Sequence, residues 1–144
     1  MIGPFTGEYI WLSNFYPSVI TAVNGDAFAT AEHAYQAAKC NLITRQGKLA
    51  WDLIKRTSNP AKARRIGKKI KVRPDWIKIR IRIMQRIILQ KFTKNIELKD
   101  KLIRTGKEKL IQVNCRGDTF WGQTPDGIGR NVLGNILMIT RQLL

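Results

Sequence analysis

The chain has 144 residues, 44% of them apolar, which is enough to build a hydrophobic core. No apolar run approaches the roughly 20 residues that a membrane span requires, and the first residues lack the basic and apolar blocks of a signal peptide. We therefore expect a cytoplasmic protein that does not enter a membrane. The sequence has no internal repeats, low-complexity tracts or linker-like stretches, which favours one domain over residues 1–144.

The charge is strongly basic and unevenly distributed. Lys and Arg number 26 against 10 Asp and Glu, a net charge of +16. Residues 41–110 carry a net charge of +17, whereas residues 1–40 carry −2 and residues 111–144 carry +1. Such a field attracts polyanions. It favours an anionic partner such as nucleic acid over the alternative that the basic side chains only keep helix surfaces hydrated.

Metal-binding and disulfide patterns are missing. The two cysteines, Cys40 and Cys115, form no CxxC pair, and the single histidine, His33, gives no zinc-ligand spacing with them. We expect reduced, buried thiols, and neither a bound metal nor another cofactor.

The first half of the chain predicts short strands followed by helices. Residues 5–28, rich in Gly, Pro, Asn and aromatic side chains, read as short strands and turns, with a hairpin turn at Asn24-Gly25. An alanine-rich helix from Thr30, its cap, to about Cys40 follows, and a second helix spans about 45–56.

The second half is expected to be mostly helical. A helix begins at Pro60 with Asn59 as its cap. Isoleucines alternate with basic residues over 77–83 as in a strand, yet the apolar pattern continues at helical spacing, so we expect a helix over 75–94. The remaining expectations are a helix from a cap at Asn95 to Gly106, a short strand over 110–113, a loop over 118–129, and a closing helix capped by Asn131.

Two places carry side chains suited to chemistry. Glu32, Gln36 and Lys39 fall on one face of the first helix, where charges on an otherwise apolar helix require partners. The alternative is a solvated helix surface. The second place is the turn from Asp118 to Gly122, followed by glycines and Asn131 at a helix start. Free amides there could bind a phosphate, and Trp121 could stack on a base; the alternative is a tight structural turn.

These motifs, in this order and spacing, resemble the YbiA/NADAR family along nearly the whole chain. The matching pieces are 12–15 (LSNF), 30–39 (TAEHAYQAAK), 63–67 (ARRIG), Trp76, 118–122 (DTFWG), Gly127, Gly129, Asn131, Leu133, Gly134, Leu137, Met138 and Arg141. The resemblance supports an α+β fold, predominantly helical, with a small β element. It also implies a hydrolase that cleaves the bond between a ribosyl carbon and a nitrogen.

Two substrate classes follow from the resemblance. One is ADP-ribose attached to guanine in DNA, RNA or nucleotides, and the other is phosphorylated ribosylamino intermediates of riboflavin synthesis. The strong basicity ranks the first above the second. A third interpretation, a nucleic-acid-binding protein without activity, explains the charge but leaves Glu32, Asp118 and Trp121 without a purpose.

The roles of individual residues follow from the chemistry and the resemblance together. Cleavage of a ribosyl C–N bond develops positive charge on the sugar, so we assign Glu32 as the catalytic carboxylate and Asp118 as its partner. The resemblance implies that Lys39 captures the opened sugar as a Schiff base; the alternative, that Lys39 only pairs with Glu32 or Asp118, stays open. His33 is expected to be structural. The candidate substrate-binding residues are Asn14, Phe15, Gln36, Trp76, Trp121, Gly122, Gly129 and Asn131, with a core position for Trp76 the stronger alternative.

Overall fold

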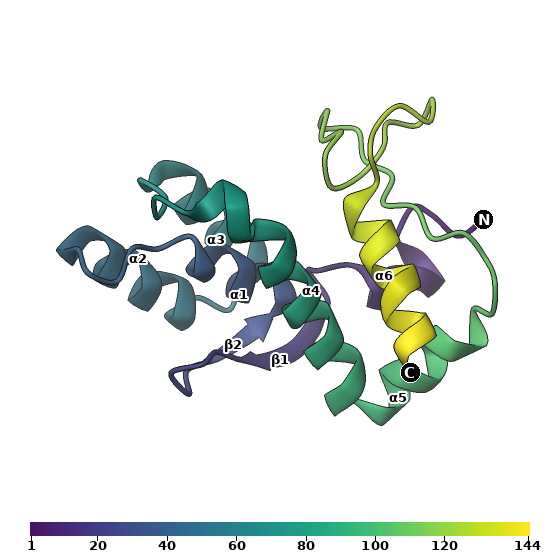
Figure 1. The fold of residues 1–144 in the computed structure, drawn as a ribbon, viewed down its shortest axis with the longest axis horizontal. Coiled ribbons are helices and arrows are strands. Elements are labelled where there is room, and N and C mark those ends of the chain that lie inside the picture. The colour runs from purple at the N-terminus through teal and green to yellow at the C-terminus, as the bar shows by residue number, and fades with distance from the viewer. The chain divides into compact units, whose positions relative to one another are not determined.

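Helices dominate the computed structural model, which describes residues 1–144 (Figure 1). In chain order the elements are η1, a 3-10 helix (Gly7–Leu12), β1 (Pro17–Thr21), β2 (Ala27–Thr30), α1 (Ala31–Ala38), α2 (Arg45–Arg56), α3 (Pro60–Lys69), α4 (Trp76–Lys94), α5 (Ile96–Arg104) and α6 (Val132–Leu143). The predicted α+β class, mostly helical with a small β element, is confirmed. The elements fall into two units: Asn14–Ile87, called the hairpin unit below, and Met1–Ser13 with Ile88–Leu144, called the terminal unit. One domain over residues 1–144 stays a prediction.

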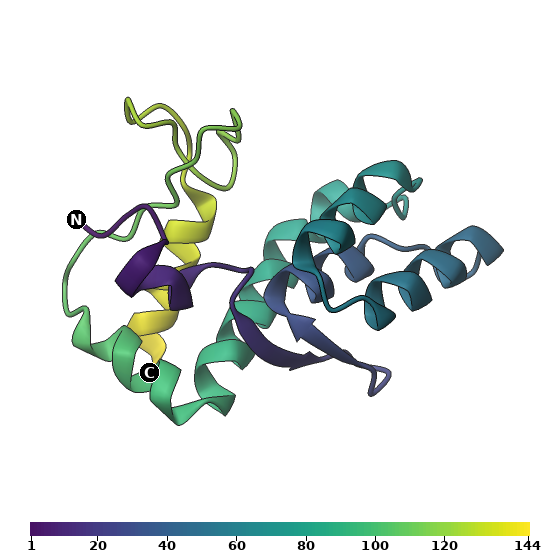
Figure 2. The same ribbon diagram turned by 180° about the vertical axis from the view of Figure 1, so that it is seen from behind.

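The strands of the hairpin unit form one antiparallel pair (Figure 2). Ile20 pairs with Phe28, and both side chains are buried. The predicted turn at Asn24-Gly25 is confirmed, because the amide of Gly25 donates to Ala22 and Gly25 has a φ of 92°, which glycine adopts without strain. Phe28 packs edge-on against Trp51 of α2, with 5.1 Å between ring centroids, so the hairpin is anchored to a helix.

Helices α1, α2 and α3 pack against one another in the hairpin unit, and α1 also packs on both strands (Figure 1). The predicted caps are confirmed at Thr30, which accepts from the amide of His33, and at Asn59, which accepts from Ala61 and Lys62. Helix α2 has its predicted bounds, and Thr44 caps its start by accepting from the amide of Gly47. Alanine and glycine at the contacts let α1 and α3 approach closely, which matters for the site described below.

The alternating isoleucine segment is helical, as predicted. It forms the first half of α4, in which Trp76, Met84 and Ile87 are buried while Ile77 is 69% exposed. A strand would have buried Ile77 and Ile79 together. The helical stripe therefore outweighs the two-residue alternation.

The terminal unit is built from η1, the end of α4, α5 and α6. Residues 7–12 form a 3-10 helix, so the expectation of only strands and turns over 5–28 is wrong there. Trp11 on this helix packs edge-on against Phe92 of α4. α6 buries the predicted face, made of Leu133, Ile136, Leu137 and Thr140.

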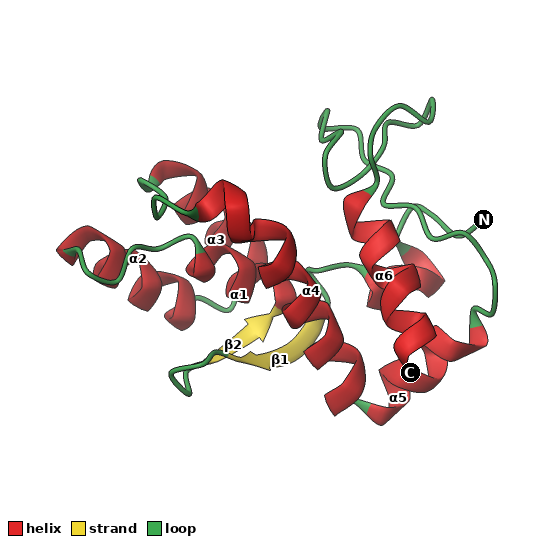
Figure 3. Ribbon diagram, viewed as in Figure 1, coloured by secondary structure: helices red, strands yellow, loops and turns green.

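The segment between α5 and α6 is a long, irregular loop (Figure 3). The strand expected over 110–113 is absent, because only single bridges form there: Leu110 pairs with Ile2, and Val113 with Gln123. Asn131 stands at the start of α6, but its side chain makes no cap bond to that helix. The side-chain amide of Asn131 instead donates from Nδ2 to the carbonyl of Leu110 and accepts at Oδ1 from the backbone amide of Gln112. These two bonds connect the loop to the start of the helix.

Both cysteines are free thiols. Cys40 is buried, and burial raises its pKa to about 11. Cys115 is exposed, which corrects the expectation that both would be buried. No helix is both long and apolar enough to pass through a bilayer, and no group of three or more His, Cys, Asp and Glu side chains is placed to hold a metal ion.

Candidate functional site

Glu32 is a buried carboxylate in the first turn of α1, with a side chain only 5% exposed. Its Oε1 accepts two hydrogen bonds, from Nε of Arg64 at 3.0 Å and from Nε2 of Gln36 at 2.9 Å. Its Oε2 accepts none. One oxygen is thus held by two donors, one of them a charged group, while the other keeps its full capacity to accept from a water or a substrate hydroxyl.

Gln36 positions Glu32, and a glycine on α3 makes room for it. A Cβ added at Gly67 would lie 1.9 Å from Oε1 of Gln36, so any larger residue here would have to displace the Gln36 side chain. The Gln36 oxygen is buried and accepts no conventional hydrogen bond. Because the Gln36 nitrogen must face the acceptor-only carboxylate, the orientation of this amide is fixed.

The turn at Asn14 and Phe15 contacts both Glu32 and its partner Arg64. The backbone carbonyl of Asn14 accepts from the amide of Glu32 at 3.0 Å, and the guanidinium of Arg64 lies 4.5 Å from the centre of the Phe15 ring. The Asn14 side chain is buried; its nitrogen faces the sulfur of Met84, a weak acceptor, and its Oδ1 has no partner. An orphaned buried acceptor next to a candidate catalytic residue is the group expected to bind a donor of the substrate.

Lys39 lies one turn beyond Gln36 on the same face and is half-buried. Burial lowers its pKa; the nearby cations Lys68 and Arg64 lower it further, against the opposing effect of Glu32. Its Nζ lies 5.5 Å from the centre of the Tyr35 ring and makes no ion pair with Glu32, whose partner is Arg64. The alternative that Lys39 simply pairs with Glu32 is therefore not what the structure contains.

His33 and Trp76 are parts of the core. His33 is fully buried, with Nδ1 2.8 Å from the Thr30 hydroxyl and Nε2 2.8 Å from the carbonyl of Thr57. Burial lowers its pKa, which favours the neutral ring that these two contacts need. Trp76 is buried against Tyr35, with 5.2 Å between ring centroids. The structural role expected for His33 and the core alternative for Trp76 agree with these contacts.

In the terminal unit, Asp118 organises its own loop. Its Oδ1 accepts from the amides of Phe120 at 3.1 Å and Trp121 at 3.0 Å, while the Asn114 side chain bonds both the amide and the carbonyl of Asp118. The Trp121 ring packs edge-on against Phe120. These contacts are those of a tight turn, and they leave Oδ2 of Asp118 without a hydrogen bond.

The expectation of free amides at the start of α6 is wrong. The amides of Asn131, Val132 and Leu133 donate to the carbonyls of residues 120–122, so they are not available to a phosphate. Gly122 and Gly129 serve close backbone packing within the same loop. A Cβ at Gly122 would lie 2.2 Å from the carbonyl oxygen of Gln112, and one at Gly129 would lie 2.3 Å from that of Gly122.

The predicted site residues divide between the two units. Asn14, Phe15, Glu32, Gln36 and Lys39 belong to the hairpin unit, where the first two and Gln36 contact Glu32 or its partner Arg64. Asp118, Trp121, Gly122, Gly129 and Asn131 belong to the terminal unit. The pairing of Asp118 with Glu32 stays a prediction. Residue-by-residue reasoning missed Arg64, although it lies in the ARRIG motif. The signal that could have pointed to it was a carboxylate on an apolar helix, which needs a charged partner, together with the arginines of this motif.

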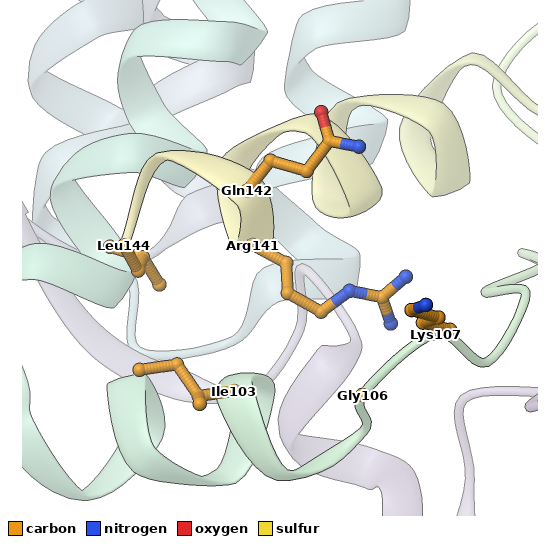
Figure 4. A pocket seen from close by; sticks show the side chains of 6 residues that line it. All are labelled: Ile103, Gly106, Lys107, Arg141, Gln142 and Leu144. Atoms are coloured by element: carbon orange, nitrogen blue, oxygen red, sulfur yellow. The ribbon is translucent and has the colours of Figure 1, made fainter.

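An open pocket of about 570 Å³ lies elsewhere, in the terminal unit, and contains none of these residues (Figure 4). Its lining residues are Ile103, Gly106, Lys107, Arg141, Gln142 and Leu144. The Arg141 guanidinium there donates to the Thr105 hydroxyl and to the carbonyl of Glu108, which joins the end of α6 to the turn after α5. We assign this arginine to the fold.

Comparison with known proteins gives a consistent set of similarities. The model of the NADAR domain matches residues 4–144. An N-glycosidase of Nostoc punctiforme is 32% identical over 136 residues, which cover 93% of this chain and 85% of that protein. A riboflavin biosynthesis protein of Vibrio vulnificus is 38% identical over 136 residues, but this chain spans only 35% of its length.

A solved structure shares the fold. The NMR structure of the Escherichia coli protein YbiA matches with a TM-score of 0.82 and 29% sequence identity, covering 99% of this chain and 82% of that one. The sequence of the N-glycosidase YbiA from Escherichia coli strain K12 is 31% identical over 139 residues, 95% of this chain and 82% of that protein.

Proposed function

Because the chain belongs to the NADAR family of YbiA-like N-glycosidases, we propose that it hydrolyses the bond between C1′ of a ribose and a nitrogen, with ADP-ribose on guanine as its substrate. The observation that carries this proposal is Glu32: a buried carboxylate whose Oε1 is fixed by two donors, while its Oε2 keeps its capacity to accept a hydrogen bond. Such a group can stabilise positive charge at C1′ or activate a water.

In the reaction, the C1′–N bond breaks and the ribose ring gains oxocarbenium character. Oε2 of Glu32 faces the developing charge or accepts a proton from the attacking water, whose oxygen adds to C1′. The leaving nitrogen gains a proton, so free ADP-ribose and guanine result. Arg64 and Gln36 hold the carboxylate in place throughout, which avoids reorganisation during the reaction.

Lys39 is a second candidate for chemistry in the same site. A lysine with a lowered pKa, without an ion-pair partner, is suited to attack the aldehyde of an opened sugar. In that step its amine bonds to C1′ and water leaves, and hydrolysis of the imine returns the lysine. The alternative is a charged Lys39 that binds a substrate anion.

The charge of the hairpin unit supports a nucleic-acid carrier. This unit holds sixteen basic and four acidic side chains, a net charge of +12, whereas the terminal unit carries +4. Lys62 and Arg65 are exposed on the side of α3 that points away from Glu32. Exposed cations of this kind bind phosphates without reading sequence and make affinity fall steeply with salt.

A second candidate is an N-glycosidase for phosphorylated riboflavin intermediates. The observation that favours it is that relatives in Vibrio vulnificus and maize are named riboflavin biosynthesis proteins. That reaction needs only a small pocket that binds one phosphate, and it leaves the +12 charge without a purpose.

The test compares three substrates at low salt: an oligonucleotide with ADP-ribosylated guanine, the ADP-ribosylated guanosine nucleoside, and ribosylaminouracil phosphate. Mass spectrometry follows release of free ADP-ribose or ribose phosphate by the wild type and by Glu32→Gln. We expect release from the first two substrates by the wild type only. The doubly substituted Lys62→Glu, Arg65→Glu protein should lose rate on the oligonucleotide while keeping its rate on the nucleoside.

Each contrary outcome has a distinct meaning. Cleavage of ribosylaminouracil phosphate alone would establish the second candidate. Salt-sensitive oligonucleotide binding without turnover of any substrate would leave a nucleic-acid-binding protein and overturn the enzymatic proposal.

A further inference from the structure

Helices α1 and α3 meet in matched steps along the face that carries Glu32. Arg64 of α3 pairs with Glu32 of α1. One turn further along both helices, Gly67 of α3 lies against Gln36 of α1. The order of these two contacts shows that α1 and α3 run in the same sense along this face.

The end of this face brings two cations together. Lys39 caps the C-terminus of α1, three residues after Gln36, and Lys68 of α3 directly follows Gly67, the residue that lies against Gln36. Lys68 is close enough to Lys39 to disfavour the charge on it. Neither lysine makes an ion pair, and the one carboxylate of this face, Glu32, is bonded to Arg64.

The chain after α3 encloses this end of α1 and adds no acid in contact with it. The amide of Arg73 donates to the carbonyl of Lys39 at 2.9 Å, and Cys40 forms a bridge with Val72. The acidic residue of this connection, Asp75, is paired with Arg73. Three cations therefore face one carboxylate, and the excess positive charge calls for an anion that the folded chain does not supply.

We propose that Lys39 and Lys68 form a subsite for a phosphate group of the substrate, next to the carboxylate that acts on the ribose. This inference rests on the proposed function, which gives the substrate class as a phosphorylated or diphosphate-linked ribose. None of the residue roles described above involves Lys68. A lysine ammonium binds phosphate as a point charge with three hydrogen-bond donors. A phosphate between two ammonium groups also relieves their mutual repulsion, so the pair binds it better than either lysine alone.

The test is calorimetric binding of ribose 5-phosphate, ADP-ribose and ribose to the wild type, Lys68→Gln and Lys69→Gln. Lys69 is the matched control: it is the next residue of α3, also exposed and equally charged, and helical spacing puts it on the side of α3 opposite Gly67. We expect Lys68→Gln to weaken both phosphorylated ligands about tenfold relative to the wild type, and Lys69→Gln to weaken them less than about twofold.

Two results would overturn the subsite: equal weakening by both variants, which would indicate only a general field effect, or no preference of the wild type for ribose 5-phosphate over ribose. The proposed function fails separately. Phosphate binding that depends on Lys68, together with no turnover of any N-glycoside, would keep the subsite and remove the assigned reaction.

Discussion

Two regions of the molecule carry a carboxylate held by two donors, and they differ in what surrounds it. Around Glu32, two helices meet with polar groups that the fold does not fully use: Oε2 of Glu32, Oδ1 of Asn14, and the ammonium of Lys39. In the loop from Asn114 to Asn131, by contrast, backbone amides and side-chain amides bond one another, and Gly122 and Gly129 stand in close backbone contacts.

The difference teaches how to separate a functional motif from a structural one. Both regions show acids, aromatics and small residues in the sequence. A buried polar group costs free energy unless it is hydrogen-bonded, so unused capacity in a buried place is a reason to look for a ligand there. The α1–α3 face has such capacity, and most of the loop does not.

The largest expected effect tests the α1–α3 face directly. Glu32→Gln keeps the size of the side chain but removes its charge, so we expect kcat to fall roughly 1000-fold while Tm changes by only a few degrees. Release of ADP-ribose, followed by mass spectrometry, measures this. Glu97→Gln, on the exposed face of α5, is the control and should retain full rate. A Glu32→Gln protein with more than a tenth of the wild-type rate would remove Glu32 from the chemistry.

The second prediction concerns Lys91, a buried cation of the terminal unit whose Nζ donates to the carbonyl of Ser13. Burial lowers its pKa to about 7. A lysine in the unfolded chain has a pKa of about 10.4. Between pH 7 and this value Lys91 is protonated in the unfolded chain but mostly neutral in the folded one, so the free energy of unfolding should rise with pH. Urea denaturation at pH 7.5 and 9.5 should show a gain of roughly 2 kcal/mol from this group.

The matched variant for this prediction is Lys91→Met. It removes the titrating group, so its free energy of unfolding should rise by roughly 2 kcal/mol less than that of the wild type between pH 7.5 and 9.5. An equal pH dependence in both proteins would mean that Lys91 keeps its charge when folded.

The third prediction asks whether Asp118 acts beyond its turn. Asn at this position retains the Oδ1 acceptor for the amides of Phe120 and Trp121, whereas Ala removes it. We expect Asp118→Asn to keep its stability but lose about tenfold in kcat, and Asp118→Ala to lose about 1 kcal/mol of stability as well. Full activity of Asp118→Asn would assign this residue to the turn alone.

The smallest effect probes the contact that aims Glu32. In Gly67→Ala the new methyl group displaces the Gln36 side chain and breaks its bond to Glu32, so we expect kcat to fall about fivefold with little change in KM. Gln36→Ala should have the same effect, and the double variant should be no worse than either one. Additive losses would show that Gly67 acts by another route.

Local sequence signals determined the secondary structure and the face of α1. The caps Thr30 and Asn59, the proline at the start of α3, and the helical stripe of α4 each act within a few residues, so their spacing is enough to predict helices close to the observed bounds. The same holds for placing Glu32, Gln36 and Lys39 on one face. The 3-10 helix at Gly7–Leu12 escaped because its short turns leave no periodic pattern.

Only the tertiary structure decided which partners these side chains have. Contacts between segments far apart in the chain decide these pairings. Glu32 bonds Arg64 and not Lys39, Gln36 packs against Gly67, and the amides at the start of α6 are already bonded. A glycine or a free amide looks the same in a sequence whether a ligand or another segment occupies the space beside it. The physical reason is that hydrogen-bonding capacity is a local property, whereas its satisfaction depends on what the fold brings near.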